Sequence, residues 1–190
     1  MPEKQKFVFK GNRDYVQGTS MFDALVKAAA DRGYCEGKIN VSFKKMIHTP
    51  VCLLEQRDQA ADDAVVARIQ DMAGKQITLT LNEAEDVVDT ERQEFDELAV
   101  CHGSVIGDRC ITQEQPHHKD LIELLVSLCK KMHLECIDSS KKWVFSRYDG
   151  HYPIPTPDKV RLEIAKQVGN RLTCSDVYIN NKKIGNIYFS

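Results

Sequence analysis

Two adjacent histidines stand directly ahead of an apolar helical segment and are the most suggestive chemical group in the chain. Residues 115–118 read Gln-Pro-His-His, and Asp120 and Glu123 follow where the helical segment begins. Histidine titrates near neutral pH and is therefore the usual general base in enzymes. Adjacent side chains point in different directions, so at most one of His117 and His118 can be the base. An ordinary exposed loop is the structural alternative.

A second polar group leads into an earlier helical segment. It comprises Asp14, Gln17, Gly18 and Thr19, with Asp23 inside the segment itself. Gly18 lets a substrate approach the backbone closely because it has no Cβ atom. Gln17 could donate to a carbonyl group or hold a water molecule, and Asp23 could be a base. The structural alternatives are that Asp23 only caps its helix and that Asp14 only fixes a turn.

The remaining candidates point to structure rather than chemistry. His48, His102 and His151 lie in contexts typical of surface or packing residues. The seven cysteines are odd in number and contain no C-x-x-C pair, which favours reduced structural thiols over disulfides or zinc. The sequence has no H-x-x-x-H spacing, no lysine-bearing phosphate loop and no G-x-S-x-G elbow. We therefore expect no metal and no cofactor.

Two apolar helices must position these groups. One is predicted over residues 20–33, ending at Gly33 as a C-terminal stop, and the other over residues 120–133. Apolar side chains cover most sides of both segments, a pattern typical of buried helices.

The two helices are predicted to begin alike. Ser20 and Asp23 have the spacing of a capping box, and so do Asp120 and Glu123. The segments ahead of them also match, because residues 11–26 can be laid on residues 107–126 with Gly-x-Arg opening both and Leu-Val closing both. This pattern predicts an internal duplication.

Candidate strands follow each helix. Alternation of Ile39, Val41 and Phe43 with polar residues predicts a half-buried strand. Further strands are predicted over 50–56, 64–70, 76–81, from 143 to 145, over 160–165, and in a C-terminal hairpin turning at 180–183. A short strand is predicted ahead of each helix, over 6–10 and 98–106. The proline-rich stretch 149–158 predicts a loop.

A short strand, a buried helix and a run of antiparallel strands, in that order, resemble the hotdog fold. The chain is similar to a tandem (double) hotdog, an α+β fold in which an antiparallel sheet wraps around two buried helices. The predicted domains are an N-terminal hotdog unit over 1–82, an acidic linker over 83–97 and a C-terminal hotdog unit over 98–190. The linker is a solvated connector or an amphipathic helix. An α+β sandwich of another topology is the alternative fold.

The resemblance implies work on acyl thioesters of coenzyme A or acyl carrier protein, by hydrolysis or by dehydration of a 3-hydroxyacyl chain. In such enzymes an acid on the buried helix, or a histidine with an acid from the partner unit, acts on a substrate at the interface. A backbone amide near the helix start polarises the thioester carbonyl. The implied residues are His117, His118 and Asp23 for catalysis, and Gln17, Gly18, Thr19 and Glu123 for substrate binding.

The sequence departs from the family patterns. The dehydratase stretch with histidine followed by a proline-glycine turn is missing, and so is the thioesterase run with an acid or histidine ahead of paired asparagines. The two halves also differ at every candidate catalytic position. A non-catalytic hotdog protein that binds an acyl ligand or a protein partner is therefore the alternative function.

Charge and hydropathy exclude some partners. The formal charge is -2 with 28% charged residues, so no basic excess indicates a nucleic-acid partner. No apolar run approaches the roughly 20 residues that span a bilayer, and the N-terminus lacks the features of a signal peptide. We expect a cytoplasmic protein, in which exposed sheet edges would permit a homodimer.

Overall fold

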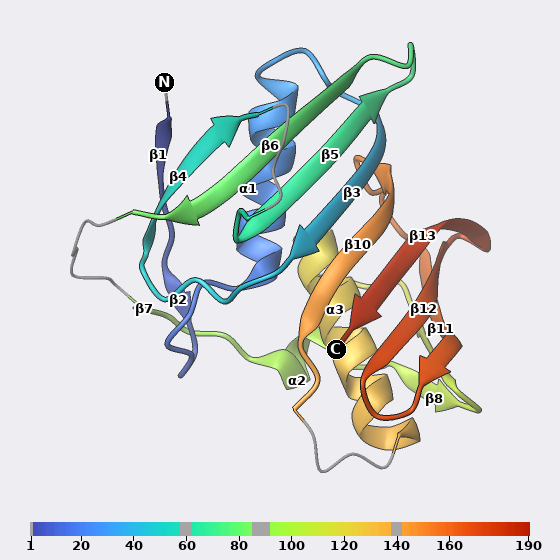
Figure 1. Ribbon diagram of the computed structural model, residues 1–190. Helices are drawn as coiled ribbons and strands as arrows, with labels where there is room; N and C mark the ends of the chain where they lie inside the picture. Colours follow the sequence, from blue (N-terminus) through green and yellow to red (C-terminus); the bar gives the residue numbers. More distant parts are fainter. Residues whose placement is uncertain (1, 58–61, 85–91, 138–141) are drawn as a thin grey trace. The chain divides into compact units, whose positions relative to one another are not determined.

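The chain forms two compact units, Met1–Phe95 and Asp96–Ser190. The computed structural model describes residues 2–57, 62–84, 92–137 and 142–190, and most of their regular structure is antiparallel sheet with few helices (Figure 1). None of the helices in these ranges has both the length and the apolar character needed to cross a bilayer. We call the two parts the first unit and the second unit and describe each by itself.

The first unit contains an antiparallel sheet in the order β1-β4-β6-β5-β3. Its strands are β1 (Glu3–Lys6), β3 (Gly37–Phe43), β4 (Val51–Gln56), β5 (Val65–Asp71) and β6 (Gln76–Glu83). A separate parallel pair joins β2 (Phe9–Lys10) to β7 (Arg92–Gln93). Alternate residues such as Ile39 and Val41 are buried, as the period-two pattern predicted.

Helix α1 (Gly18–Ala30) packs against β6 in the first unit. Its buried residues are Thr19, Met21, Phe22, Leu25, Ala28 and Ala29. Asp23 and Lys27 are exposed, so the helix buries one face rather than its whole circumference. Gly33 has a φ of 85°, a left-handed conformation that glycine adopts without strain, and it lies in the turn after the helix.

The predicted capping box at Ser20 and Asp23 is wrong. The helix begins two residues earlier than Ser20, and its N-cap residue is Gln17 in an extended conformation. Gln17 makes no side-chain capping hydrogen bond, and the first turn of α1 contains no acidic residue. Ser20 therefore lies inside the helix, and Asp23 lies one turn too late to cap it.

The second unit contains the strand order β8-β9-β11-β12-β13-β10, again antiparallel throughout. Its elements are α2 (Glu97–Val100), β8 (Val105–Gly107), β9 (Cys110–Glu114), α3 (Leu121–Cys136), β10 (Phe145–Tyr152), β11 (Lys159–Val168), β12 (Leu172–Ile179) and β13 (Lys182–Phe189). Helix α3 packs against β9 and β11, and α2 packs against α3. The predicted loop over 149–158 begins later than expected, because β10 continues to Tyr152.

The two units insert their final strand at different places. In the first unit the last sheet strand, β6, lies between β4 and β5. In the second unit the last strand, β13, lies between β12 and β10. In the first unit the second strand after the helix, β4, pairs with the fourth, β6. In the second unit the second strand after the helix, β11, pairs with the third, β12. The predicted duplication stays a prediction, and it must accommodate this difference.

The strand predicted over 98–106 is wrong for most of its length. Asp96 accepts hydrogen bonds from the backbone N–H groups of Leu98 and Ala99, and this cap starts α2 instead. The strand that precedes α3 is β9, which alternation of apolar residues did not reveal. Its second inward-facing residue is the polar Gln113, which is buried and donates to the backbone carbonyls of Val100 and His102. The segment predicted over 6–10 contains the last residue of β1 and the whole of β2.

The C-terminal hairpin was predicted correctly, and two asparagines form its turn. Asn180 and Asn181 have φ values of 51° and 65°, the left-handed pair that a two-residue type I′ turn requires. The Asn180 side chain also accepts hydrogen bonds from the backbone N–H groups of Asp158 and Lys159. Asparagine tolerates this backbone conformation better than most residues.

We predict that Asn181→Gly is neutral or slightly stabilising, because glycine reaches a positive φ without steric cost. Asn181→Val should lower the free energy of unfolding by about 1–2 kcal/mol, since a β-branched residue is strained there. Urea unfolding of both variants measures the difference. Equal stability of the two variants would contradict the turn assignment.

Candidate functional site

A histidine–carboxylate pair lies where α3 begins. His118 Nε2 is 2.8 Å from Glu123 Oε1. Glu123 is 5% exposed, whereas the His118 side chain keeps 27% of its surface accessible. Burying a carboxylate is costly unless it is paired and hydrogen-bonded, so the histidine is the partner that permits this burial. The result is a reachable imidazole held by a buried acid.

The same contact assigns the tautomer of the ring. When Glu123 is ionised its carboxylate only accepts hydrogen bonds, and Nε2 of His118 is then the donor of this contact. In a neutral imidazole the other nitrogen, Nδ1, then carries the lone pair. Nδ1 has no hydrogen-bond partner in the part of the chain that the structure describes. This arrangement is that of a general base oriented by an acid.

The helix start that carries this pair is itself capped. The Asp120 side chain accepts a hydrogen bond of 3.0 Å from the backbone N–H of Glu123. The predicted N-cap at Asp120 is therefore confirmed. Glu123, the other member of the predicted box, directs its carboxylate to His118. One acid thus orders the helix end while the other holds the imidazole.

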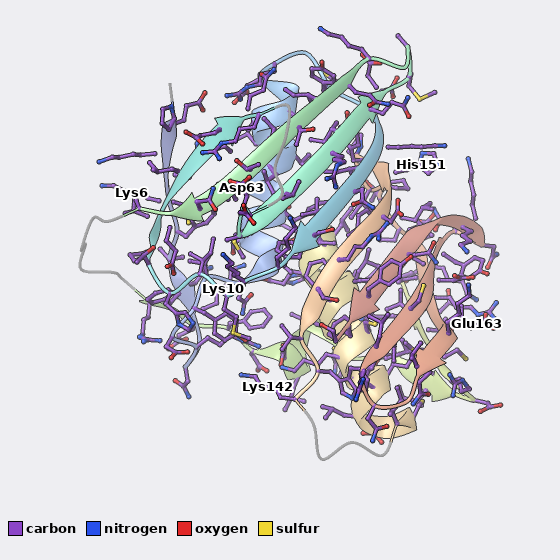
Figure 2. All side chains as sticks on the ribbon, in the orientation of Figure 1. Lys6, Lys10, Asp63, Lys142, His151 and Glu163 are labelled. Atoms are coloured by element: carbon purple, nitrogen blue, oxygen red, sulfur yellow. The ribbon has the colours of Figure 1, made fainter. Side chains whose placement is uncertain are left out.

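His117, predicted to be a candidate base, and the three weaker candidates are all exposed, and among these four His48 is the one that faces a carboxylate, with its Nδ1 4.0 Å from Asp14 Oδ2. His117 is exposed, next to His118 in the chain. His102 is exposed after α2, and His151 is exposed near the end of β10 (Figure 2). In the first unit His48 is exposed, and its Nδ1 lies 3.0 Å from the backbone oxygen of Asp14.

The start of α1 presents backbone donors. Gln17 and Thr19 are 8% and 3% exposed, and the Thr19 hydroxyl donates to the Gln17 side-chain oxygen at 3.3 Å. The first intrahelical bond runs from Met21 N–H to the Gln17 carbonyl. Among the described residues, the backbone N–H groups of Gly18, Thr19 and Ser20 have no acceptor. Amides of this kind point along the helix axis and favour negative charge.

The two helix starts therefore differ in whether a side chain caps the first-turn backbone N–H groups. At α3 a carboxylate already occupies the first turn, whereas at α1 no side chain does. The predicted residues Gln17, Gly18 and Thr19 are brought together at α1, and His118 and Glu123 at α3. Asp23 lies on the exposed side of α1. The two groups belong to different units.

The sequence assigned no role to His133, the most deeply buried histidine. It lies on α3 with no exposed surface, and its Nδ1 is 2.6 Å from the Cys129 carbonyl oxygen. Its Nε2 is 2.5 Å from the Thr173 hydroxyl, and its ring stacks on Phe189 with centroids 4.9 Å apart. Both nitrogens are satisfied without any charge. His133 is thus a core residue that joins α3 to β12.

The cysteines are free thiols, as predicted. Burial raises the pKa of the Cys129 thiol to about 12, and the Cys52 thiol likewise to about 12. Thiols held neutral in this way are poor nucleophiles. No group of three or more histidine, cysteine, aspartate or glutamate residues within the described ranges has the geometry to hold a metal ion.

Comparison with solved structures finds a similar fold in a dehydratase domain, a proposed thioesterase and a tesB protein. The dehydratase domain of PpsC from Mycobacterium tuberculosis, solved in complex with C12:1-CoA, aligns with 100% of this chain and 92% of its own, at 11% identity and a TM-score of 0.54. A proposed thioesterase II from Thermobifida fusca aligns over 94% and 86%, at 11% identity and a TM-score of 0.52. The tesB protein of Mycobacterium avium subspecies paratuberculosis aligns over 98% and 89%, at 9% identity and a TM-score of 0.53.

These structures belong to hotdog-fold families, so the predicted resemblance to that fold is confirmed. At 9–11% identity the likeness concerns the fold alone. By sequence, no family model and no curated protein matches the chain.

We predict that the second unit loses stability on mild acidification because of His133. Burial lowers the pKa of His133 from its ordinary value of 6.5. The unfolded chain therefore takes up the proton first, so stability is full above pH 6.5 and is lost as the pH falls from there toward the folded pKa. Thermal unfolding at pH 7.5, 6.5 and 5.5 measures the loss.

His133→Phe should flatten this pH dependence, because phenylalanine cannot titrate. His151→Ala, which removes an exposed histidine from the same unit, should leave the dependence as in the wild type. An unchanged pH dependence in His133→Phe would refute the assignment.

Proposed function

We propose that the protein hydrolyses acyl thioesters of coenzyme A or acyl carrier protein, with His118 as the general base. The observation that carries this proposal is the 2.8 Å contact between His118 and the buried Glu123. The fold supports the substrate class, since it is that of the PpsC dehydratase domain solved with an acyl-CoA. Glu123, predicted to bind substrate, is assigned instead to positioning the base.

Hydrolysis needs one proton acceptor and one stabiliser of negative charge. Nδ1 of His118 takes a proton from water as the water oxygen attacks the thioester carbonyl carbon. Glu123 stabilises the imidazolium that forms, because the buried carboxylate lies against Nε2. When the carbon–sulfur bond breaks, the imidazolium returns the proton to the departing thiolate. The products are a carboxylic acid and a free thiol.

We infer separately, for the first unit by itself, that the first-turn amides of α1 donate hydrogen bonds to an oxygen of an acyl ligand. Donors that are already aligned bind a negatively charged or carbonyl oxygen without reorganising. Gly18 leaves the backbone open to close approach, and the buried Gln17 and Thr19 support the turn through their mutual hydrogen bond. An uncapped helix start is suited to this role in a way that the capped start of α3 is not.

Dehydration of a 3-hydroxyacyl thioester is the second candidate reaction, and the likeness to the PpsC dehydratase domain favours including it. That reaction needs one group to remove the α-proton and another to protonate the departing hydroxyl. Asp23, predicted to be catalytic, lies in the first unit and stays a prediction from the sequence for the second group. A non-catalytic protein that binds an acyl ligand is the outcome if neither reaction is found.

For the fold, we infer a double hotdog with units at 1–82 and 98–190 joined by an acidic linker at 83–97, each sheet covering a buried helix. Support comes from each unit having one main helix, two short strands ahead of it and four sheet strands after it. Part of the linker, 85–91, including Val87 and Val88, lies outside the described residues. The homodimer remains a proposal from the sequence.

We predict that His118→Ala lowers kcat/KM for acyl-CoA hydrolysis by about 10²–10⁴-fold, the usual contribution of a general base. His117→Ala is the matched control and should stay near the wild-type rate, because its side chain is exposed and lies outside the pair. Glu123→Gln should give an intermediate loss, since the amide still accepts a hydrogen bond but carries no charge. Steady-state assays of thiol release measure all three.

Full activity of His118→Ala, or a larger loss in His117→Ala, would overturn the assignment of the base. A panel of acyl-CoA and acyl-carrier-protein thioesters, saturated and 3-hydroxylated, separates hydrolysis from dehydration.

We predict that Gly18→Pro weakens binding of an acyl thioester by about tenfold, as expected when one hydrogen-bond donor to the ligand is removed. Proline is well tolerated at the first position of a helix and removes only the N–H. Gln17 already has φ -66° and ψ 140°, a conformation that a following proline permits. Gly18→Ala keeps the N–H and is the control. Equal affinities of the two variants for the thioester, measured by calorimetry, would show that this amide does not contact the ligand.

A further inference from the structure

Strand β8 forms one end of the sheet of the second unit and presents an edge without charged residues. Among the described strands it pairs with β9 alone. Its three residues, Val-Ile-Gly, carry no charge. The end strand of the first unit, β1, reads Glu-Lys-Gln-Lys instead, and edge lysines protect a sheet against pairing with another chain. Of these two edges, β8 is therefore the one suited to accept a further strand.

The open side of β8 presents the backbone of Ile106. A two-residue turn, Asp108-Arg109, joins β8 to β9, and Gly107 and Cys110 flank this turn. The pair that flanks such a turn exchanges hydrogen bonds, and the next pair along the ladder does not. The N–H and C=O groups of Ile106 therefore point away from β9. Within the described ranges, no other backbone group pairs with them.

Two opposite charges lie at the two ends of this edge. Lys131 Nζ of α3 donates to Ser104 Oγ at 2.9 Å, so the ammonium lies at the residue that precedes β8. Cys136, at the end of α3, has its Sγ 3.8 Å from the Gly107 carbonyl oxygen, so the helix runs along the strand. Asp108, the residue that follows β8, is exposed. In the part of the chain that the structure describes, neither Lys131 nor Asp108 forms an ion pair.

We propose that β8 pairs with β8 of a second copy of this chain, antiparallel and across a two-fold axis at Ile106. In this register the N–H and C=O groups of Ile106 bond to those of the same residue in the second copy. Val105, which is 68% exposed, lies opposite Gly107 of the second copy, where no side chain obstructs it. The inference does not depend on the proposed function. It names one edge and one register for the self-association that the sequence permits.

Charge complementarity favours a second copy over a strand of another protein. In the same register Ser104 of one copy lies opposite Asp108 of the other, and opposite residues share a face of the sheet. That face is the one on which α3 lies, because Lys131 contacts the Ser104 side chain. Lys131 is therefore brought beside Asp108 of the second copy. The contact occurs twice, since a two-fold interface is isologous.

Sedimentation velocity over a series of protein concentrations tests the inference. The wild type should form a weak dimer whose fraction rises with concentration, because a three-residue strand gives an interface below the standard size. Asp108→Lys and Lys131→Glu should each weaken the dimer by at least about tenfold, since each places like charges opposite one another. Lys6→Glu is the matched control on the edge of β1 (Figure 2) and should dimerise like the wild type.

An equimolar mixture of Asp108→Lys and Lys131→Glu separates strand pairing from a folding defect. In the mixed pair the native Lys131 faces the native Asp108, and the introduced lysine faces the introduced glutamate. A mixed dimer should therefore form with about the wild-type affinity, although each variant alone stays monomeric.

Three results overturn the inference at β8: a wild type that stays monomeric throughout the series, a single variant that dimerises like the wild type, or a mixture that does not dimerise. Loss of the dimer in Lys6→Glu also overturns it, because that result assigns the contact to β1.

Discussion

In each unit one helix must bury an apolar face against an antiparallel sheet, and this constraint places every candidate group. The buried face of α1 runs from Thr19 to Ala29, and that of α3 from Ile122 to His133. At the ends of such a helix, backbone N–H and C=O groups have no hydrogen-bond partner within the helix. The groups that could do chemistry therefore lie where the two helices begin, at the edge of the apolar contact.

Burial also explains why the polar groups of the second unit are paired. Glu123 can be almost completely buried because His118 contacts its carboxylate. His133 can be completely buried because the Cys129 carbonyl and the Thr173 hydroxyl contact its two ring nitrogens. The two histidines nevertheless differ in use. His118 keeps an accessible surface and an unengaged nitrogen, whereas the His133 ring is enclosed by α3, β12 and Phe189. One imidazole can meet a substrate, and the other holds a core together.

Most strands were predictable because their apolar residues alternate, as Ile39 and Val41 do. The errors occurred where a polar contact replaced apolar burial. In β9 the alternation of apolar and polar residues is interrupted by Gln113, whose buried side-chain amide donates to backbone carbonyls. Asp96 turns a β-like run into the short helix α2 by capping it. Ser20 and Asp23 had the spacing of a cap, yet α1 begins at Gly18, and spacing alone does not say where the first helical hydrogen bond forms.

The sequence by itself determined the two helices, most of the strands, the position of the last hairpin and a pair of adjacent histidines as candidate catalytic residues. These features depend on local sequence patterns, that is, on the types and spacing of residues close together in the chain. Only the tertiary structure decided that His118 rather than His117 meets Glu123, that His133 is buried, and that Arg92 lies beside Phe9 and the carbonyl of Arg13. These choices depend on which side chain is turned inward and on which distant strands pair, and a side chain's direction is set by the packing of the whole unit.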